Sequence, residues 1–181
     1  MKNPQEIIDN LSPSDALSIL KTLAVNDEQL ANRIAEIALD RLNQVDPEEI
    51  AAFVYDALNF LEVEELWDRA GSTRHGYVEP GEAADQMIDE VLEPFLIDMK
   101  KYQQLGLSVH ARQLCIGLLA GLRRFDDEST SQFKEWASDA PAVFTEAVID
   151  AWKEGKPSRA DRKTVRAFME EELGIWESRL I

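Results

Sequence analysis

The sequence is poor in the residues that build metal centres and catalytic sites. Its 181 residues include one cysteine, Cys115, and two histidines, His75 and His110. A single cysteine excludes a disulfide within the chain, and this set cannot supply the usual zinc ligands. The chain also lacks a phosphate-binding glycine loop, a nucleophile elbow and an HExxH zinc motif. We therefore expect no metal and no cofactor, and we favour a non-enzymatic protein.

Basic residues are also scarce. The chain carries 19 Lys and Arg against 35 Asp and Glu, a net charge of −16. Such a charge disfavours nucleic acid and anionic membranes unless a basic patch stands apart from it. No apolar segment follows a basic one at the N-terminus, so we expect no secretory signal and a cytoplasmic location.

Long hydrophobic runs are missing, and the central apolar run is short. Leu114–Leu122, LCIGLLAGL, has nine residues, whereas a membrane-spanning helix needs about 20. We therefore expect no membrane association and predict a helix over 108–125, capped by Ser108 and buried on nearly every side. Gly117 and Gly121 lie four residues apart on one face, where we predict a close helix crossing. Cys115 lies within this run as a small hydrophobic residue.

Helical periodicity extends along the rest of the chain, with no convincing strand alternation. The clearest helix start is Asp46 as the cap with Pro47 at the first position, and Trp67 falls on a core face of a later helix. Pro94 predicts a kink or split in a long helix after Pro80. The sequence thus predicts an all-α fold of about nine or ten helices, either an irregular helical bundle or a HEAT/armadillo-like stack. No clean repeat of about 40 residues supports the stack.

We expect residues 1–155 to form a single helical domain, with 156–181 as a helical extension packed on it. The longest interruption of the periodicity is the segment 71–81, GSTRHGYVEPG. We interpret it as a loop, and loops of this length in helical domains are often functional.

The polar residues around this loop are the best candidate for a partner- or ligand-binding site. Asp98 falls at the edge of an apolar stripe and requires a basic partner, for which Arg69 or Arg74 is suitable. An alternative is that these loop side chains cap helices and pair with local acids. The candidate site residues are Asp68, Arg69, Arg74, His75, Tyr77 and Asp98.

A second candidate surface lies near the C-terminus. Arg159, Arg162, Lys163 and Arg166 recur at helical spacing and form one basic face on an acidic protein. This face could contact an anionic partner, but pairing with acids of the same chain or of a second copy is more typical. By contrast, the acids Glu82, Asp85, Asp89 and Glu93 lie opposite an apolar stripe and read as a solvated face.

The segments ALNFLEVEELWDRAG, TRHGYVEPGEAA, LCIGLLAGLRRF and FKEWASDAP, within 51–152, resemble a family of uncharacterised prokaryotic proteins. The resemblance implies an all-helical, repeat-like domain, which some members carry beside a SWIM-type zinc finger. This chain lacks the cysteines and histidines of such a finger, so zinc-dependent nucleic-acid binding does not carry over.

These observations favour a helical-repeat-like adaptor that binds another protein, with self-association also open. A small-ligand-binding protein or enzyme with its site at 71–81 is the alternative. A nucleic-acid-associated accessory protein acting through the basic face is a weaker one.

Overall fold

The computed structural model describes residues 3–42, 45–74, 76–172 and 174. The chain divides into two units, Met1–Gln44 and Val45–Ile181. The last helix, 159–172, packs within the second unit, and the expected division at residue 155 stays a prediction.

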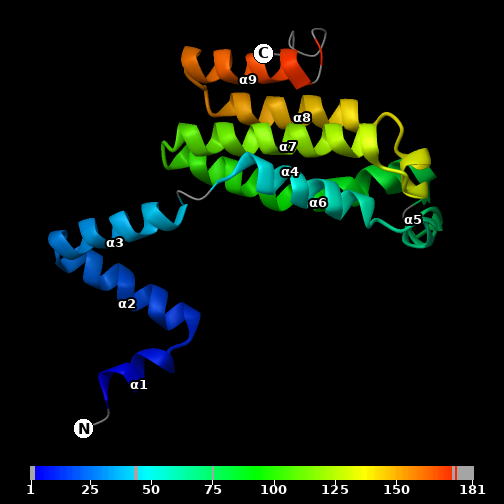
Figure 1. The fold of residues 1–181 in the computed structure, drawn as a ribbon. Helices are drawn as coiled ribbons and strands as arrows, with labels where there is room; N and C mark the ends of the chain where they lie inside the picture. The colour runs from blue at the N-terminus through cyan, green and yellow to red at the C-terminus, as the bar shows by residue number, and fades with distance from the viewer. Residues whose placement is uncertain (1–2, 43–44, 75, 173, 175–181) are drawn as a thin grey trace. The chain divides into compact units, whose positions relative to one another are not determined.

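The described part of the first unit contains three helices: α1 (Pro4–Asp9), α2 (Pro13–Asn26) and α3 (Glu28–Leu42). Ser12 caps α2, since its hydroxyl accepts a hydrogen bond from the Asp15 amide at 3.2 Å. Asp27 alone separates α2 from α3, and its carboxylate accepts from the Leu30 amide at 3.0 Å. Such caps satisfy amides that have no partner within the helix. The two helices contact each other and diverge from this junction (Figure 1).

The second unit contains six α-helices, one 3₁₀-helix and one hairpin among the residues described. The all-α prediction is therefore confirmed, and the helices form a bundle (Figure 1). The elements in order are α4 (Pro47–Asn59), α5 (Val63–Arg69), β1 (Gly71–Thr73), β2 (Gly76–Val78), α6 (Pro80–Gln104), α7 (Ser108–Glu128), η1 (Gln132–Trp136), α8 (Ala140–Glu154) and α9 (Arg159–Glu172).

Helix α7 is the centre of this unit and packs against α4, α6, α8 and α9. Its apolar run is buried as predicted: Leu114, Cys115 and Leu118 are each almost completely removed from water. The predicted cap is wrong, because Leu107 occupies the cap position and Ser108 is the first helical residue. A helix with four neighbours requires apolar residues on most of its circumference, which explains the run.

The predicted close crossing is confirmed and involves α4. A Cβ atom built on Gly117 would lie 2.7 Å from Cβ of Ile50 and 2.8 Å from the carbonyl oxygen of Pro47. One built on Gly121 would lie 2.7 Å from Cβ of Val54. Real Cβ contacts are longer, so the two glycines are what permits α4 to approach α7 this closely.

Helix α6 runs unbroken from Pro80 to Gln104 with Pro94 inside it, so the helix does not split, and the alternative of a kink at Pro94 stays a prediction. Its acids Glu82, Asp85, Asp89 and Glu93 are exposed, as the helical spacing predicts, and Ile88 and Met99 are buried on the opposite side. None of the described helices has the length and apolar composition needed to cross a bilayer.

Candidate functional site

The segment 71–81 is a β-hairpin followed by the first turn of α6, which corrects the loop interpretation. β1 and β2 pair antiparallel, with Ser72 opposite Tyr77. Gly71 and Gly76 have φ angles of 98° and 137°, which residues with a side chain rarely adopt. Three-residue strands are too short to show an alternating pattern, so the hairpin could not be predicted from the periodicity.

The hairpin presents polar and aromatic side chains to solvent. Arg74 lies in its turn and is exposed, and Tyr77 on β2 is also exposed. His75, the third candidate here, lies outside the described residues. Asp68 is exposed on α5, directly before the hairpin.

Arg69, at the end of α5, is held by two carboxylates. Its Nη1 and Nη2 donate to the two oxygens of Glu90 at 2.7 and 2.9 Å, and Nη2 also donates to Glu65 at 2.6 Å. These hydrogen bonds, the one to Glu90 first, raise the pKa of Arg69, and the same contact lowers the pKa of Glu90. The bidentate pairing of Arg69 with Glu90 holds α5 on α6 and leaves less of the guanidinium available for a ligand.

Asp98 does not join this cluster. Its side chain is 53% exposed, and its nearest ion-pair partner is Lys101 on the same helix, at 3.9 Å. The expectation that Asp98 is partly buried is therefore wrong, and of its two expected partners, Arg69 and Arg74, the first is held by Glu90 and Glu65. A single site that includes Arg69 and Asp98 has no support in these contacts.

Two tryptophans form an exposed pair beside the hairpin. The rings of Trp67 on α5 and Trp136 on η1 lie edge to face, with centroids 4.8 Å apart and an interplanar angle of 76°. Trp67 is 49% exposed and Trp136 is 38% exposed. The expected role of Trp67 as a core anchor is therefore wrong, since Leu66 next to it takes the buried position. Trp136 was missed because its partner is 69 positions away in the sequence.

The first turn of α6 passes close to this pair. A Cβ atom built on Gly81 would lie 4.0 Å from the carbonyl oxygen of Trp136. One turn further along α6 is Asp85, whose pKa is raised, first by desolvation and then by the charges of Asp89 and Asp139. The repulsion indicates that carboxylates crowd this end of the bundle.

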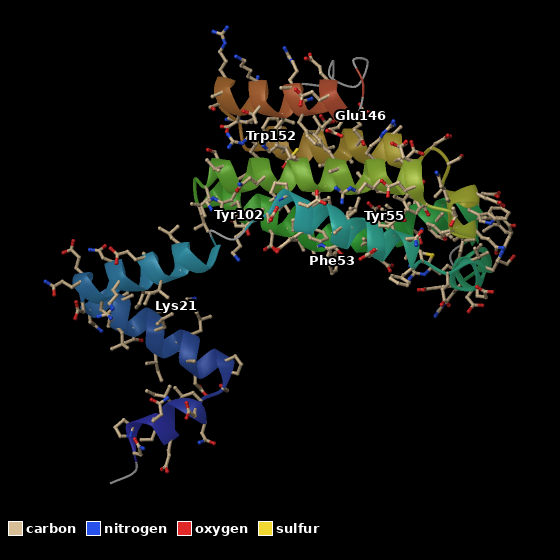
Figure 2. All side chains as sticks on the ribbon, viewed as in Figure 1. Lys21, Phe53, Tyr55, Tyr102, Glu146 and Trp152 are labelled. Carbon is tan, nitrogen blue, oxygen red and sulfur yellow. The ribbon has the colours of Figure 1, made fainter. Side chains whose placement is uncertain are left out.

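A second aromatic pair lies on a different part of the bundle. Phe53 on α4 and Phe95 on α6 meet edge to face with centroids 5.6 Å apart. Phe53 is on the outer side of α4 and is largely exposed (Figure 2). Phe53 is thus an exposed aromatic residue that lies away from the β-hairpin.

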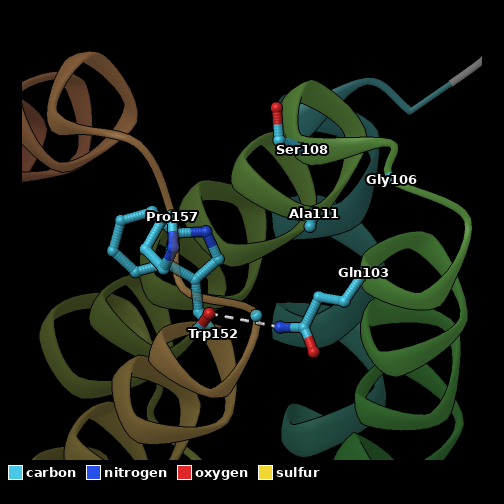
Figure 3. Close-up of a pocket in the computed structure, with 7 residues that line it drawn as sticks. Gln103, Gly106, Ser108, Ala111, Trp152 and Pro157 are labelled. Carbon is cyan, nitrogen blue, oxygen red and sulfur yellow. Dashed lines mark hydrogen bonds between the residues drawn. The ribbon is translucent and has the colours of Figure 1, made fainter.

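Two pockets that are lined by described residues lie away from the hairpin. One of about 70 Å³ is formed by the end of α6, the start of α7 and the end of α8 (Figure 3). There Nε2 of Gln103 donates to the carbonyl oxygens of Ala151 and Trp152 at 2.9 and 3.2 Å. This volume holds a few waters, whereas small-molecule sites occupy about 300–1,000 Å³.

A larger cleft, of about 390 Å³, lies between α7 and α9. Both arginines that line it are paired with acids. Arg124 donates to both oxygens of Glu48 at 2.7 Å, and Nε of Arg123 lies 2.8 Å from a carboxylate oxygen of Asp127. Among the residues that the structure describes, no group of three or more His, Cys, Asp and Glu side chains is arranged to hold a metal ion.

The predicted basic face lies on α9 and is exposed. It consists of Arg159, Arg162, Lys163 and Arg166. The other side of α9 buries Asp161, Val165 and Met169. Burial of this side orients the four basic side chains toward solvent.

Comparison with known proteins found no family model, no curated protein and no solved structure that matches this chain. The resemblance to the family that includes SWIM-associated members therefore stays a prediction.

Proposed function

We propose that this protein is a cytoplasmic, non-enzymatic, helical-repeat-like adaptor that binds another protein through its hairpin end. We name this end of the bundle the aromatic end and define it as Trp67, Trp136 and Tyr77. The observation that carries the proposal is the exposed edge-to-face contact between Trp67 and Trp136, whose rings are 4.8 Å apart.

Tryptophan and tyrosine dominate the binding energy of protein interfaces, because each buries a large rigid surface at a small cost in side-chain entropy. Each tryptophan of the pair restricts the other, so the surface is partly ordered before a partner arrives. Pre-ordering of this kind lowers the entropic cost of association.

The carboxylates around the aromatic end favour a particular partner chemistry. Asp68 adjoins Trp67, and Asp85 and Asp139 interact repulsively at the same end of the bundle. A partner segment with an apolar anchor flanked by Lys or Arg would bury the rings and relieve this repulsion.

The two alternatives have weaker support. A small-ligand site or an enzyme at residues 71–81 would lose Arg69, which Glu65 and Glu90 already hold, and neither pocket described above includes the hairpin. Nucleic-acid association through the basic face must overcome a net charge of −16.

The test is affinity capture of the intact chain from a native lysate, beside a Trp67→Ala, Trp136→Ala double variant. Phe53→Ala is the matched control, because it removes an exposed aromatic ring away from the hairpin. Circular dichroism establishes that all three proteins are folded. A protein retained by the wild type and the control but lost from the double variant supports the proposal. Equal retention by all three, or capture of nothing, contradicts it.

A further inference from the structure

The first unit leaves its apolar side chains uncovered. No residue of α1 or α2 is buried. Nine large apolar residues among the described part of 1–44 are exposed: Ile7, Ile8, Leu17, Ile19, Leu20, Leu23, Val25, Ile37 and Leu39. A segment of this size cannot bury a core of its own, so these side chains need cover from elsewhere.

Most of the exposed apolar residues of α2 and α3 fall on one stripe of their helix. At 100° per residue, Leu20 and Leu23 occupy the middle of an uncharged arc on α2, and Ile34 and Ile37 occupy a stripe on α3 that is uncharged over residues 30–38. Val25 and Leu39 lie on the opposite sides of their helices.

The contact between the two helices covers little of these stripes. In α2 and α3, the described side chains that are partly covered are Ala24, Leu30, Ala31 and Ile34, near the junction at Asp27. Farther from the junction the helices diverge, and Leu17 and Leu20 remain exposed. The helix pair α2 and α3 therefore presents an open apolar surface.

We propose that this surface binds the same surface of a second copy of the chain. Residues 13–39 of the two copies would form a four-helix bundle, in which the apolar stripes of both α2–α3 pairs face a shared core. Pairs of helical hairpins close in this way with a two-fold axis, since each stripe meets its own equivalent. The inference is independent of the proposed function, which rests on the aromatic end of the second unit.

Charge favours a second copy at this place. Residues 1–44 carry 4 basic and 7 acidic side chains, a net charge of −3 out of −16 for the chain. Two copies that meet through this unit therefore bring together only 3 of the 16 net negative charges of each chain. A strongly charged partner would gain little electrostatic attraction from an apolar stripe that carries no charge.

The available area is also of the right size. A half-exposed leucine or isoleucine still presents on the order of 50–80 Å² of apolar surface, and five such residues lie on the two stripes: Leu17, Ile19, Leu20, Leu23 and Ile37. These five supply up to about half of the roughly 800 Å² that a standard interface buries per partner, and the alanines and the stems of polar neighbours add to it.

The test is sedimentation equilibrium of the full-length chain over a range of micromolar concentrations. The wild type is expected at twice the monomer mass of 20.5 kDa. A Leu20→Glu, Leu23→Glu double variant should weaken dimerisation by at least about 100-fold, since four carboxylates enter one apolar core. The matched control is Val25→Glu, Leu39→Glu, which adds the same charge on the opposite sides of α2 and α3 and should remain dimeric.

Hydrogen exchange of the wild type gives a second measurement that does not depend on the folding of a variant. Amide protection within 13–39 should increase with protein concentration. A monomeric wild type overturns the proposal, as does concentration-independent protection, which would place these helices against their own chain. Equal loss of dimer in both double variants would assign the contact to another surface and also overturn it.

Discussion

The guanidinium of Arg112 on α7 donates a hydrogen bond of 2.7 Å to the carboxylate of Asp161 on α9. The other oxygen of that carboxylate accepts from the hydroxyl of Ser158 at 2.6 Å, and the Ser158 hydroxyl accepts from the Asp161 amide at 3.1 Å. Asp161 therefore completes the cap of α9 and attaches the helix to the centre of the bundle. Its side chain is 6% exposed, so the pair is largely shielded from water.

Replacement of Arg112 by alanine should lower the free energy of unfolding by about 1–3 kcal/mol, because it leaves a buried carboxylate without its charged partner. Urea unfolding followed by circular dichroism measures the loss. Arg159→Ala, an exposed change on α9, should alter stability by less than about 0.5 kcal/mol. The double variant Arg112→Ala, Asp161→Ala should lose less than the sum of the single changes. Full additivity would contradict a direct coupling.

Gly117→Ala should destabilise the protein by about 1–3 kcal/mol. The added methyl would enter the space of Ile50 and the Pro47 carbonyl, both under 3 Å away. Gly81→Ala is the control, since the nearest atom to its new methyl is 4.0 Å away. Helix propensity alone predicts that both changes stabilise by about 1 kcal/mol. A gain in stability for Gly117→Ala would therefore refute the close crossing.

Cys115 should be inert to thiol reagents in the folded protein. Complete burial raises the pKa of its thiol, which removes the reactive thiolate, and the surrounding run excludes the reagent. Titration with a chromogenic disulfide at pH 8 should detect no reactive thiol until urea unfolds the chain. Val25→Cys provides the positive control, because position 25 is 86% exposed. Rapid reaction of the wild type under native conditions would show that the apolar run opens.

Asp85→Asn should raise the melting temperature slightly at pH 7. Because the folded-state pKa of Asp85 is raised, the group favours folding below its unfolded pKa, and this contribution is lost as pH rises through the folded value. At pH 7 the ionised side chain therefore opposes folding, by up to about 0.5 kcal/mol at this exposed position.

The stabilisation from Asp85→Asn should disappear as pH falls below the folded pKa of Asp85, where the wild type is also neutral. Thermal unfolding at pH 7 and at pH 4 or below gives the comparison, and Glu93→Gln on the same helix is the control for loss of charge. A gain of the same size at low pH would contradict the electrostatic explanation.

Much of the helical framework was predictable because local signals determine it. Asp46 and Pro47 mark the start of α4, and Ser12 and Pro13 mark the start of α2, as capping chemistry requires. Gly117 and Gly121 predicted a close crossing, because two glycines on one face of a buried helix have few other uses. The partner helix, α4, was not predictable from that spacing.

The contacts of the candidate site join residues far apart in the sequence, and no local pattern predicts such contacts. Arg69 or Arg74 was the expected partner of Asp98, but Arg69 binds Glu90, two turns earlier on α6. Trp67 was expected in the core because of its helical spacing. This spacing cannot distinguish a buried helix face from a face that contacts only one exposed side chain, here Trp136. The ring of Trp136 completes that neighbourhood only after η1 folds back on α5.

The central position of α7 also sets an order for folding during synthesis. Helix α4 ends at Asn59, but the helix that covers its apolar face begins only at Ser108. At ribosomal rates of about 5–20 residues per second, α4 therefore waits for several seconds before its partner emerges. During that interval Val54 lacks the face of α7 on which it packs, and of the helices that contact α4 in the bundle, α6, which begins at Pro80, is synthesised before α7.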